Sequence, residues 1–120
     1  MPDPLPPAED LLPLPPAFFH ILIALADEER HGYGIMLDVA ARTNGRMRMG
    51  PGTLYGSLKR MVQGGLIEEA EERPAPDFDD ERRRYYRISD YGRTVASAET
   101  ARLARLVSQA RTRKLNPRRA

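Results

Sequence analysis

Prolines and glycines divide this chain into segments and limit where a helix or a strand can form. The prolines are concentrated in the opening stretch, MPDPLPPAEDLLPLPP, which spans residues 1–16. Each proline lacks a backbone donor and keeps the residue before it out of the α region. We therefore predict that residues 1–16 form a disordered or polyproline-like arm that ends at about Pro16.

Two helices are predicted directly after the arm. Residues 17–27 place Phe18, Leu22 and Leu25 on one broad apolar stripe, which is typical of a largely buried helix. The second helix begins in HGYGIM and ends at Asn44-Gly45. Its glycines at 32 and 34 either let a neighbouring helix approach closely or mark a loose helix start.

A third helix is predicted over residues 51–63. Pro51 suits a first helical turn, where its missing donor does no harm, and Gly64-Gly65 supplies the stop. One face of this helix is apolar and should pack on the core: Leu54, Leu58, Met61 and Val62.

Three strands and a last helix complete the expected order. The alternation Arg46-Met47-Arg48-Met49 predicts one short strand. Residues 66–72 and 82–89 predict a hairpin with a turn-rich connector. A final helix should start near Ser89 or Asp90, both good N-caps, and run to about Lys114.

Helix, helix, short strand, helix, hairpin, helix is the order of a winged helix-turn-helix. The predicted fold class is therefore α+β and mainly α, with a winged-helix domain over residues 17–89. Residues 90–115 form the last helix, and residues 116–120 form a basic tail.

Charge is unevenly distributed along the chain, although its net value is only +2. Segments 46–63 and 102–120 carry lysine and arginine without any acid, whereas segment 68–81 is strongly acidic. Basic surfaces of this kind favour a polyanionic partner, and the alternative is scattered, solvated charge.

Several classes of protein are disfavoured by what the sequence lacks. It has no long apolar run for a membrane span, no signal peptide and no cysteine, so a cytoplasmic location is expected. His20 and His31 are too few for a metal site, and no cofactor is expected. The acids of the hairpin tip, Asp79 to Glu81, have no catalytic partner, so we do not expect an enzyme.

The third helix is the candidate for a DNA major groove. Its polar face offers small residues, hydroxyls and two cations, which suit contacts to base edges and phosphates. The alternative is an ordinary surface helix with two cations. The candidate DNA-binding residues here, with one arginine that precedes the helix, are Arg48, Thr53, Tyr55, Ser57, Lys59 and Arg60.

The hairpin could add contacts as a wing. Arg82, Arg83 and Arg84 are within reach of phosphates or a minor groove in such a fold. The partner strand is acidic, however, and cross-strand ion pairs would occupy some of these arginines. We expect a tip bent away from the duplex with one or two arginines left for DNA.

The last helix has an apolar stripe longer than a small wing can cover. It either packs on its own domain or pairs with a second copy, and we favour the second copy. The candidate dimerisation residues are Val95, Leu103, Leu106, Val107 and Ala110.

Three motifs resemble one known family. PGTLYGSLKRMVQGGLIE resembles the most characteristic segment of PadR-type regulators, HGYGIM is similar to the start of their second helix, and YYRISDYGR resembles their wing return strand and the turn that follows it. The resemblance covers roughly residues 17–95 and points to the small type with a single C-terminal helix. Gly56 departs from it, because proline is common at that position.

The resemblance implies a repressor that dimerises through its last helix. It places Thr53, Tyr55, Ser57 and Lys59 on the DNA-facing helix, with Tyr55 at the phosphate backbone. It also implies a possible small aromatic or hydrophobic effector. The predicted function is a homodimeric, sequence-specific regulator on a pseudo-palindromic operator in double-stranded DNA. The alternatives are a winged-helix module that binds a protein and a non-specific architectural DNA binder.

Overall fold

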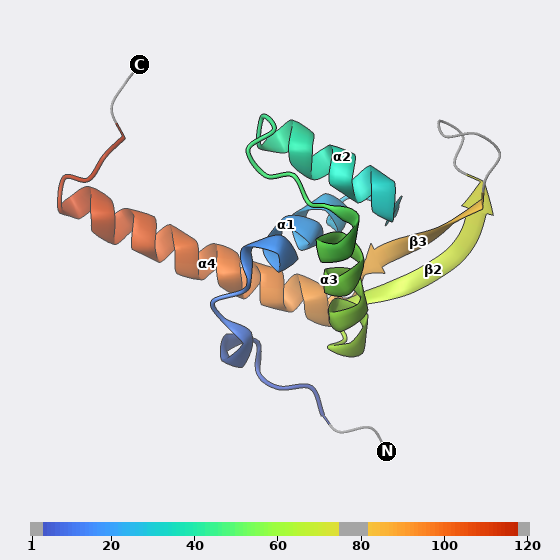
Figure 1. The fold of residues 1–120 in the computed structure, drawn as a ribbon. Coiled ribbons are helices and arrows are strands. Elements are labelled where there is room, and N and C mark those ends of the chain that lie inside the picture. Colours follow the sequence, from blue (N-terminus) through green and yellow to red (C-terminus); the bar gives the residue numbers. More distant parts are fainter. Residues whose placement is uncertain (1–3, 75–81, 118–120) are drawn as a thin grey trace.

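The computed structural model describes residues 4–74 and 82–117. It is mainly helical, with a small antiparallel sheet at one side (Figure 1). In chain order the elements are the 3-10 turn η1 (Ala8–Leu11), α1 (Pro16–Leu25), β1 (Arg30–His31), α2 (Gly32–Arg42), α3 (Pro51–Gln63), β2 (Ile67–Pro74), β3 (Arg82–Ile88) and α4 (Asp90–Thr112).

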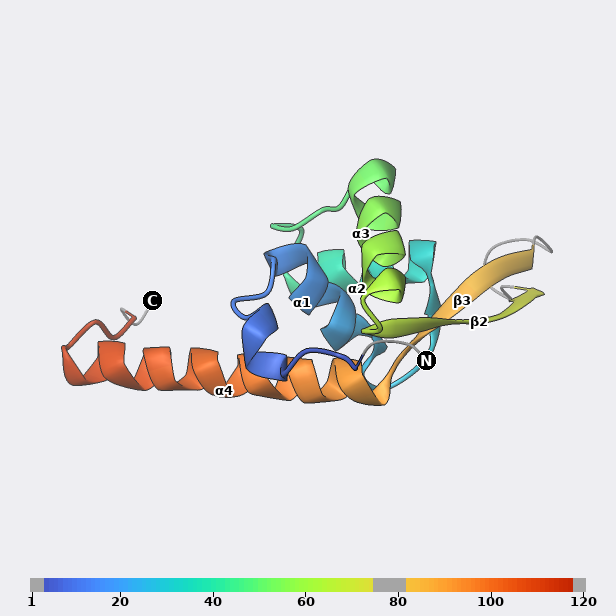
Figure 2. The ribbon, with the colours of Figure 1, turned by 90° about the horizontal axis from the view of Figure 1, so that it is seen from below.

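The sheet has the strand order β1-β3-β2, with both pairs antiparallel. Ile67 lies opposite Ile88, and Arg30 of β1 lies opposite Tyr86 on the other edge of β3. The register shifts between Glu69 and Glu72, as at a β-bulge. The β2–β3 hairpin projects from the helices in both views (Figures 1 and 2).

The strand predicted at residues 46–49 is wrong, because these residues, all of them described, form no strand. Their alternation is real, since Met49 is buried whereas Arg46 and Arg48 are exposed. A strand also needs a hydrogen-bonded partner, and β1 and β2 occupy the two edges of β3. The short strand of this fold is Arg30–His31 instead.

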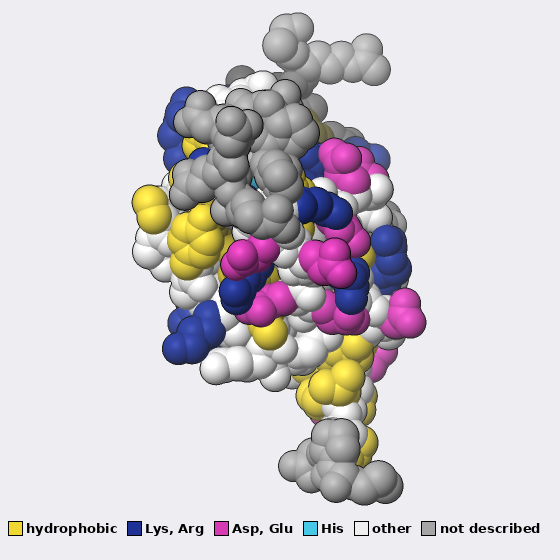
Figure 3. Space-filling model, turned by 90° about the vertical axis from the view of Figure 1, so that its right-hand side faces the viewer, with side chains coloured by type: hydrophobic (Ala, Val, Ile, Leu, Met, Phe, Trp, Pro, Cys, Tyr) yellow, Lys and Arg dark blue, Asp and Glu magenta, His cyan; other side chains and the backbone are white. Residues whose placement is uncertain are grey.

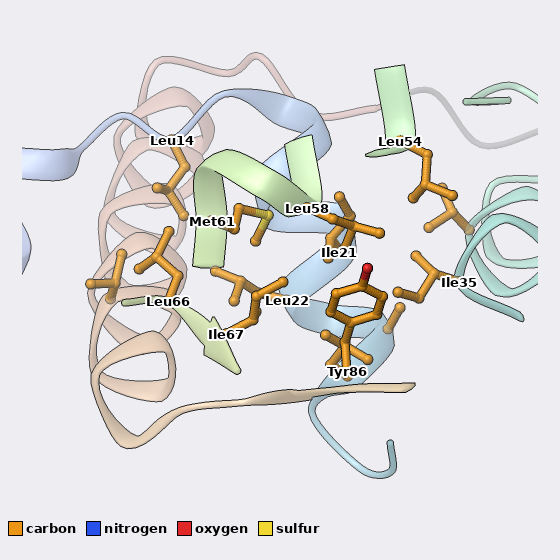
Figure 4. Packing of buried hydrophobic residues seen from close by; sticks show 14 of the residues in the cluster. Leu14, Ile21, Leu22, Ile35, Leu54, Leu58, Met61, Leu66, Ile67 and Tyr86 are labelled. Atoms are coloured by element: carbon orange, nitrogen blue, oxygen red, sulfur yellow. The ribbon is translucent and has the colours of Figure 1, made fainter. Parts of the chain in front are cut away.

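The core forms where α3, α4 and the sheet meet around α1 (Figure 4). Ile21 and Leu22 of α1 have no exposed surface, which confirms that this helix is largely buried. Helix α3 contributes its predicted apolar face, and Tyr86 enters from β3. The other buried apolar residues of these elements include Leu54, Leu58, Met61, Ile67 and Val95.

A tight corner joins the end of α3 to the start of α4. The amide of Leu66 donates to the carbonyl of Met61, and Gly65 has a φ of 78°, so α3 ends in a Schellman motif. Ser89 caps α4 by accepting from the Gly92 amide and donates its hydroxyl to the Leu66 carbonyl at 2.9 Å. We call Gly65, Leu66, Ser89 and Gly92 the α3–α4 corner.

Gly92 is required at this corner by close approach. A Cβ there would lie 2.0 Å from the carbonyl oxygen of Leu66, a main-chain atom that cannot move aside alone. The start of α4 is therefore pressed directly against the turn that ends α3. This contact fixes the direction in which α4 leaves the domain.

The arm is ordered from residue 4 onward, so the disordered form predicted for residues 1–16 is wrong for that part. Of the polyproline-like alternative, Pro7 and Pro15 have the backbone angles, with φ of −54° and ψ of 143° and 138°. Residues 1–3 lie outside the described range. Ala8 and Leu14 are buried, and the Tyr91 hydroxyl donates to the Pro6 carbonyl at 2.6 Å. Apolar side chains between the prolines find a packing surface on α4, which local proline rules do not reveal.

Helix α4 runs under the domain, and its second half extends past the other elements (Figure 2). Its first half is anchored by the buried residues Val95 and Glu99. In the second half, Leu103, Leu106 and Val107 are between 37% and 50% exposed. Within the described ranges, no helix is both long and apolar enough to cross a membrane.

Candidate nucleic-acid interface

The outer face of α3 is polar and carries no acid. Thr53, Tyr55, Lys59 and Arg60 are all exposed there. The guanidinium of Arg60 lies 5.9 Å from the ring centroid of Phe18, so this cation leans over α1. The face therefore presents two hydroxyl groups and two cations from one helix.

Ser57 does not belong to this face, contrary to the prediction. Its side chain is only 1% exposed. It lies three residues after Leu54 and directly before Leu58, on the side of the helix that packs on the core. A buried hydroxyl here cannot reach a duplex.

Tyr55 lies against the start of α2. Its side chain is 49% exposed, and its ring covers Gly32, the first residue of that helix. A Cβ on Gly32 would lie 2.6 Å from the Tyr55 hydroxyl oxygen. Of the two explanations left open for Gly32, the structure supports the close approach of a neighbouring helix.

The loop between α2 and α3 carries two more exposed cations. The Thr43 hydroxyl donates to the Val39 carbonyl and accepts from the Met47 amide, which fixes the loop. Arg48, a predicted contact, is exposed just before α3. Arg46 is exposed in the same loop and was not among the predicted contacts, although the alternation of arginine and methionine pointed to it.

These four cations differ from those of the wing in their pairing. With the described residues, none of Arg46, Arg48, Lys59 and Arg60 forms an ion pair. They can therefore bind an anionic partner without first breaking an ion pair with a described carboxylate.

Arg84 and Arg87 of the wing form ion pairs with acids of the neighbouring strand. Arg84 contacts Glu69 at 3.1 Å and Glu72 at 3.3 Å, and Arg87 contacts Glu68 at 3.2 Å. The hydrogen bond that Arg84 donates to the Glu72 carboxylate and the charge of Glu69 raise the pKa of Arg84. Figure 3 shows basic and acidic side chains adjoining on this face of the molecule. The predicted contact Arg84 is thus held by the wing itself.

The other two predicted wing contacts differ in what the structure describes. The half-buried Arg83 has its guanidinium carbon 5.9 Å from the ring centroid of Tyr33 on α2. The side chain of Arg82 and the acids Asp77 to Glu81, at which the bent tip was predicted, lie outside the described residues.

Val95 is not part of the exposed stripe of α4, contrary to the prediction. It has no exposed surface, because it packs within the core of its own domain. Leu103, Leu106 and Val107 are exposed, and Ala110 is partly so. The apolar surface therefore begins later on α4 than the sequence pattern suggested.

An apolar groove of about 260 Å³ adjoins this stripe between α1 and α4. Its lining includes Phe19, Ile23, Ala96 and Thr100. Ala96 and Thr100 share a helix face with Leu103 and Val107, at spacings of four, three and four residues. Groove and stripe thus form one continuous surface.

The surroundings of both histidines fit a structural role. The Nδ1 atom of His31 accepts a hydrogen bond from the Gly34 amide, so His31 caps α2. Burial and the nearby Arg83 lower the pKa of His31, and burial and Arg42 lower that of His20. Among the described residues, no group of three or more possible metal ligands comes together.

Three helices followed by a two-stranded wing, with the third helix exposed, define a winged helix-turn-helix. This confirms the predicted fold. The chain belongs to the transcriptional regulator PadR-like family, whose sequence profile matches residues 21–98. The resemblance carried by PGTLYGSLKRMVQGGLIE is thereby confirmed.

Two solved structures share this fold. A PadR-like transcriptional regulator from Bacillus cereus has a TM-score of 0.66 at 22% identity, with 92% of this chain and 96% of that chain covered. PadR from Bacillus subtilis in complex with operator DNA has a TM-score of 0.58 at 18% identity, with 68% and 44% covered.

A sequence relative is much longer than this chain. A 37.1 kDa protein in a transposon of Streptomyces fradiae is 35% identical over 86 residues, which are 72% of this chain. The match spans only 22% of that protein.

Proposed function

We propose that this protein is a sequence-specific DNA-binding regulator that acts as a homodimeric repressor. The observation that carries the proposal is the set of four cations on α3 and the preceding loop, which form no ion pair with described residues. The complex of Bacillus subtilis PadR with operator DNA supports the same choice of partner.

In this proposal α3 enters the major groove. Thr53 and Tyr55 lie in its first half and reach base edges or phosphates, while Lys59 and Arg60 lie further along and contact the backbone. Arg46 and Arg48 flank the start of the helix. If all four cations of each protomer neutralise phosphates, log K falls against log salt with a slope of about −7 for a dimer.

The homodimer rests on the exposed surface of α4. The stripe Leu103, Leu106 and Val107 of one protomer covers the α1–α4 groove of its partner, and the reverse contact follows by two-fold symmetry. A two-fold dimer presents its recognition helices about 34–36 Å apart, which is one turn of DNA. The operator is then pseudo-palindromic.

The same proposal includes a small aromatic or hydrophobic effector that regulates DNA binding. The groove beside Phe19 and Ile23 is apolar and lies at the surface that a second copy would cover. A ligand there changes the packing of the two protomers and so the fit to DNA. Release of bound DNA by simple phenolic acids, absent with aliphatic acids of similar size, would support this part.

Selection from a random-sequence DNA pool tests the proposed function. The wild-type protein should enrich a two-fold-related motif and bind it far more tightly than a scrambled duplex, with steep salt dependence. Equal binding of all duplexes would favour an architectural DNA binder. Failure to retain any duplex at low salt would exclude DNA binding and favour a protein-binding module.

A further inference from the structure

Gly32 and Tyr55 belong to two different helices, α2 and α3, and the Tyr55 side chain lies directly against Gly32. A Cβ on Gly32 would meet the Tyr55 hydroxyl oxygen at 2.6 Å and ring atoms Cε1 and Cζ at 2.9 Å. Real Cβ atoms essentially never approach so closely. The ring therefore lies on the backbone of α2 in a position that only glycine allows.

This requirement is local to Gly32. The glycines of α3, Gly52 and Gly56, would place a Cβ in open space. Gly34, in the same turn of α2, would place its Cβ at 3.4 Å from His31, an ordinary contact distance. The φ angle of Gly32 is not in the left-handed region, so side-chain room rather than backbone freedom explains the glycine.

We propose that Gly32 is a positioning residue for DNA binding and acts through Tyr55. The bare backbone of Gly32 seats the aromatic ring and fixes where the Tyr55 hydroxyl lies relative to α3. This inference rests on the proposed function, because it assigns Tyr55 a contact with the duplex.

This contact explains how a side chain that is half exposed can be held in one position. Half of the Tyr55 surface faces solvent, and an exposed tyrosine would otherwise sample several rotamers. Seating it on Gly32 removes that freedom before DNA arrives, which lowers the ordering cost of binding. Loss of the seat should weaken binding without unfolding the domain, since the group displaced is the outer end of one side chain.

Gly32→Ala tests the proposal, with Gly34→Ala as the matched control in the same helical turn. Both variants gain one methyl group and the same helix propensity. Gly32→Ala should bind the duplex enriched by the wild-type protein about tenfold more weakly, as expected when one hydrogen bond to a charged phosphate is misplaced. Gly34→Ala should bind like wild type, and both should unfold cooperatively at similar urea concentrations.

A double-mutant cycle separates positioning from a general structural effect. In a Tyr55→Ala background no aromatic ring lies against residue 32, so Gly32→Ala should produce no further loss of affinity. An equal loss in both backgrounds would overturn the proposal, as would wild-type affinity of Gly32→Ala itself. Failure of the wild-type protein to enrich any duplex would instead refute the proposed function, and the inference with it.

A measurement without DNA isolates the contact. In the free protein the ring current of Tyr55 should perturb the NMR signals of the Gly32 Hα atoms, and Tyr55→Ala should remove that perturbation. A Gly32 signal that ignores Tyr55→Ala would show that the ring is not seated there, which also overturns the proposal.

Discussion

The backbone amide of Leu14 donates a hydrogen bond of 2.8 Å to the carboxylate of Glu99. The two residues are 85 positions apart, and Glu99 is only 2% exposed. The Arg102 guanidinium binds the other oxygen of the same carboxylate. A buried acid on α4 therefore anchors the N-terminal arm, together with the hydrogen bond from Tyr91 to the Pro6 carbonyl.

This bond predicts a pH-dependent contribution to stability. The Arg102 hydrogen bond, assisted by the Leu14 amide and opposed by burial, holds the pKa of Glu99 below its ordinary value. The contribution is therefore fully present above the ordinary glutamate pKa and is lost as the pH falls through the lowered one. Glu99→Gln should cost on the order of 1 kcal/mol near neutral pH.

Urea unfolding of wild type and Glu99→Gln from about pH 7 to about pH 3 measures this. The difference in the free energy of unfolding between the two proteins should shrink on acidification. A difference that is independent of pH would mean that Glu99 does not act through its charge.

Lys59 should contact a phosphate in each half-site. Lys59→Ala would then reduce the magnitude of the salt slope of a dimer by about two, because two counterion-releasing contacts are lost. Arg105→Ala, which removes an exposed cation from α4, should leave the slope unchanged. Titrations by fluorescence anisotropy at several salt concentrations give both slopes, and equal slopes for the two variants would remove Lys59 from the interface.

Neutralising the acids that hold Arg84 should increase DNA affinity. In the double variant Glu69→Gln, Glu72→Gln this arginine keeps its charge and loses its two ionic partners. We expect severalfold tighter binding and a steeper salt slope, since wing cations become available to phosphates. The double variant Glu9→Gln, Asp10→Asn, at two exposed positions of the arm, controls for the same change of two units in net charge. Unchanged affinity of the wing variant would place the wing away from the duplex.

Gly92→Ala should destabilise the protein by about 2 kcal/mol or more, because the new methyl group overlaps the Leu66 carbonyl. Gly56→Ala is the contrasting variant, since its Cβ meets open space. It should stabilise α3 by about 0.5–1 kcal/mol through helix propensity. Urea unfolding checks both, and equal stability of the two variants would contradict the close approach at the α3–α4 corner.

Leu106→Glu should produce folded monomers. Leu106 is 48% exposed, so the charge costs little within one protomer but would be buried in a dimer. Arg105→Glu, on the opposite side of the same turn, changes charge without entering the stripe. Sedimentation equilibrium measures the association, and a dimer of unchanged strength in Leu106→Glu would exclude this surface.

The elements with strong local signals were predictable from the sequence. Helix α3 has the predicted bounds because Pro51 starts it and the Gly64-Gly65 pair ends it, whatever the rest of the chain does. The hairpin and the Ser89 start of α4 follow similarly local rules. The exposure of Tyr55 and Lys59 followed from the position of the core stripe on α3.

The features that depend on distant partners were missed. The arm needs α4 to pack against, and strand β1 exists only because β3 offers it an edge. Ser57 and Val95 border an apolar stripe, where periodicity alone does not decide between core and surface. The contact of Tyr55 with Gly32 joins the motifs PGTLYGSLKRMVQGGLIE and HGYGIM, which are separate along the sequence.

At the α3–α4 corner, the end of the helix proposed to bind DNA is in direct contact with the start of the helix proposed to pair the protomers. Its hydrogen bonds and the Gly92 contact hold the end of α3 against the start of α4. We therefore expect that a change in the angle at which two α4 helices cross also changes the spacing of the two α3 helices. In such a dimer, an effector that changes the crossing angle of the α4 helices would release DNA while each domain keeps its own fold.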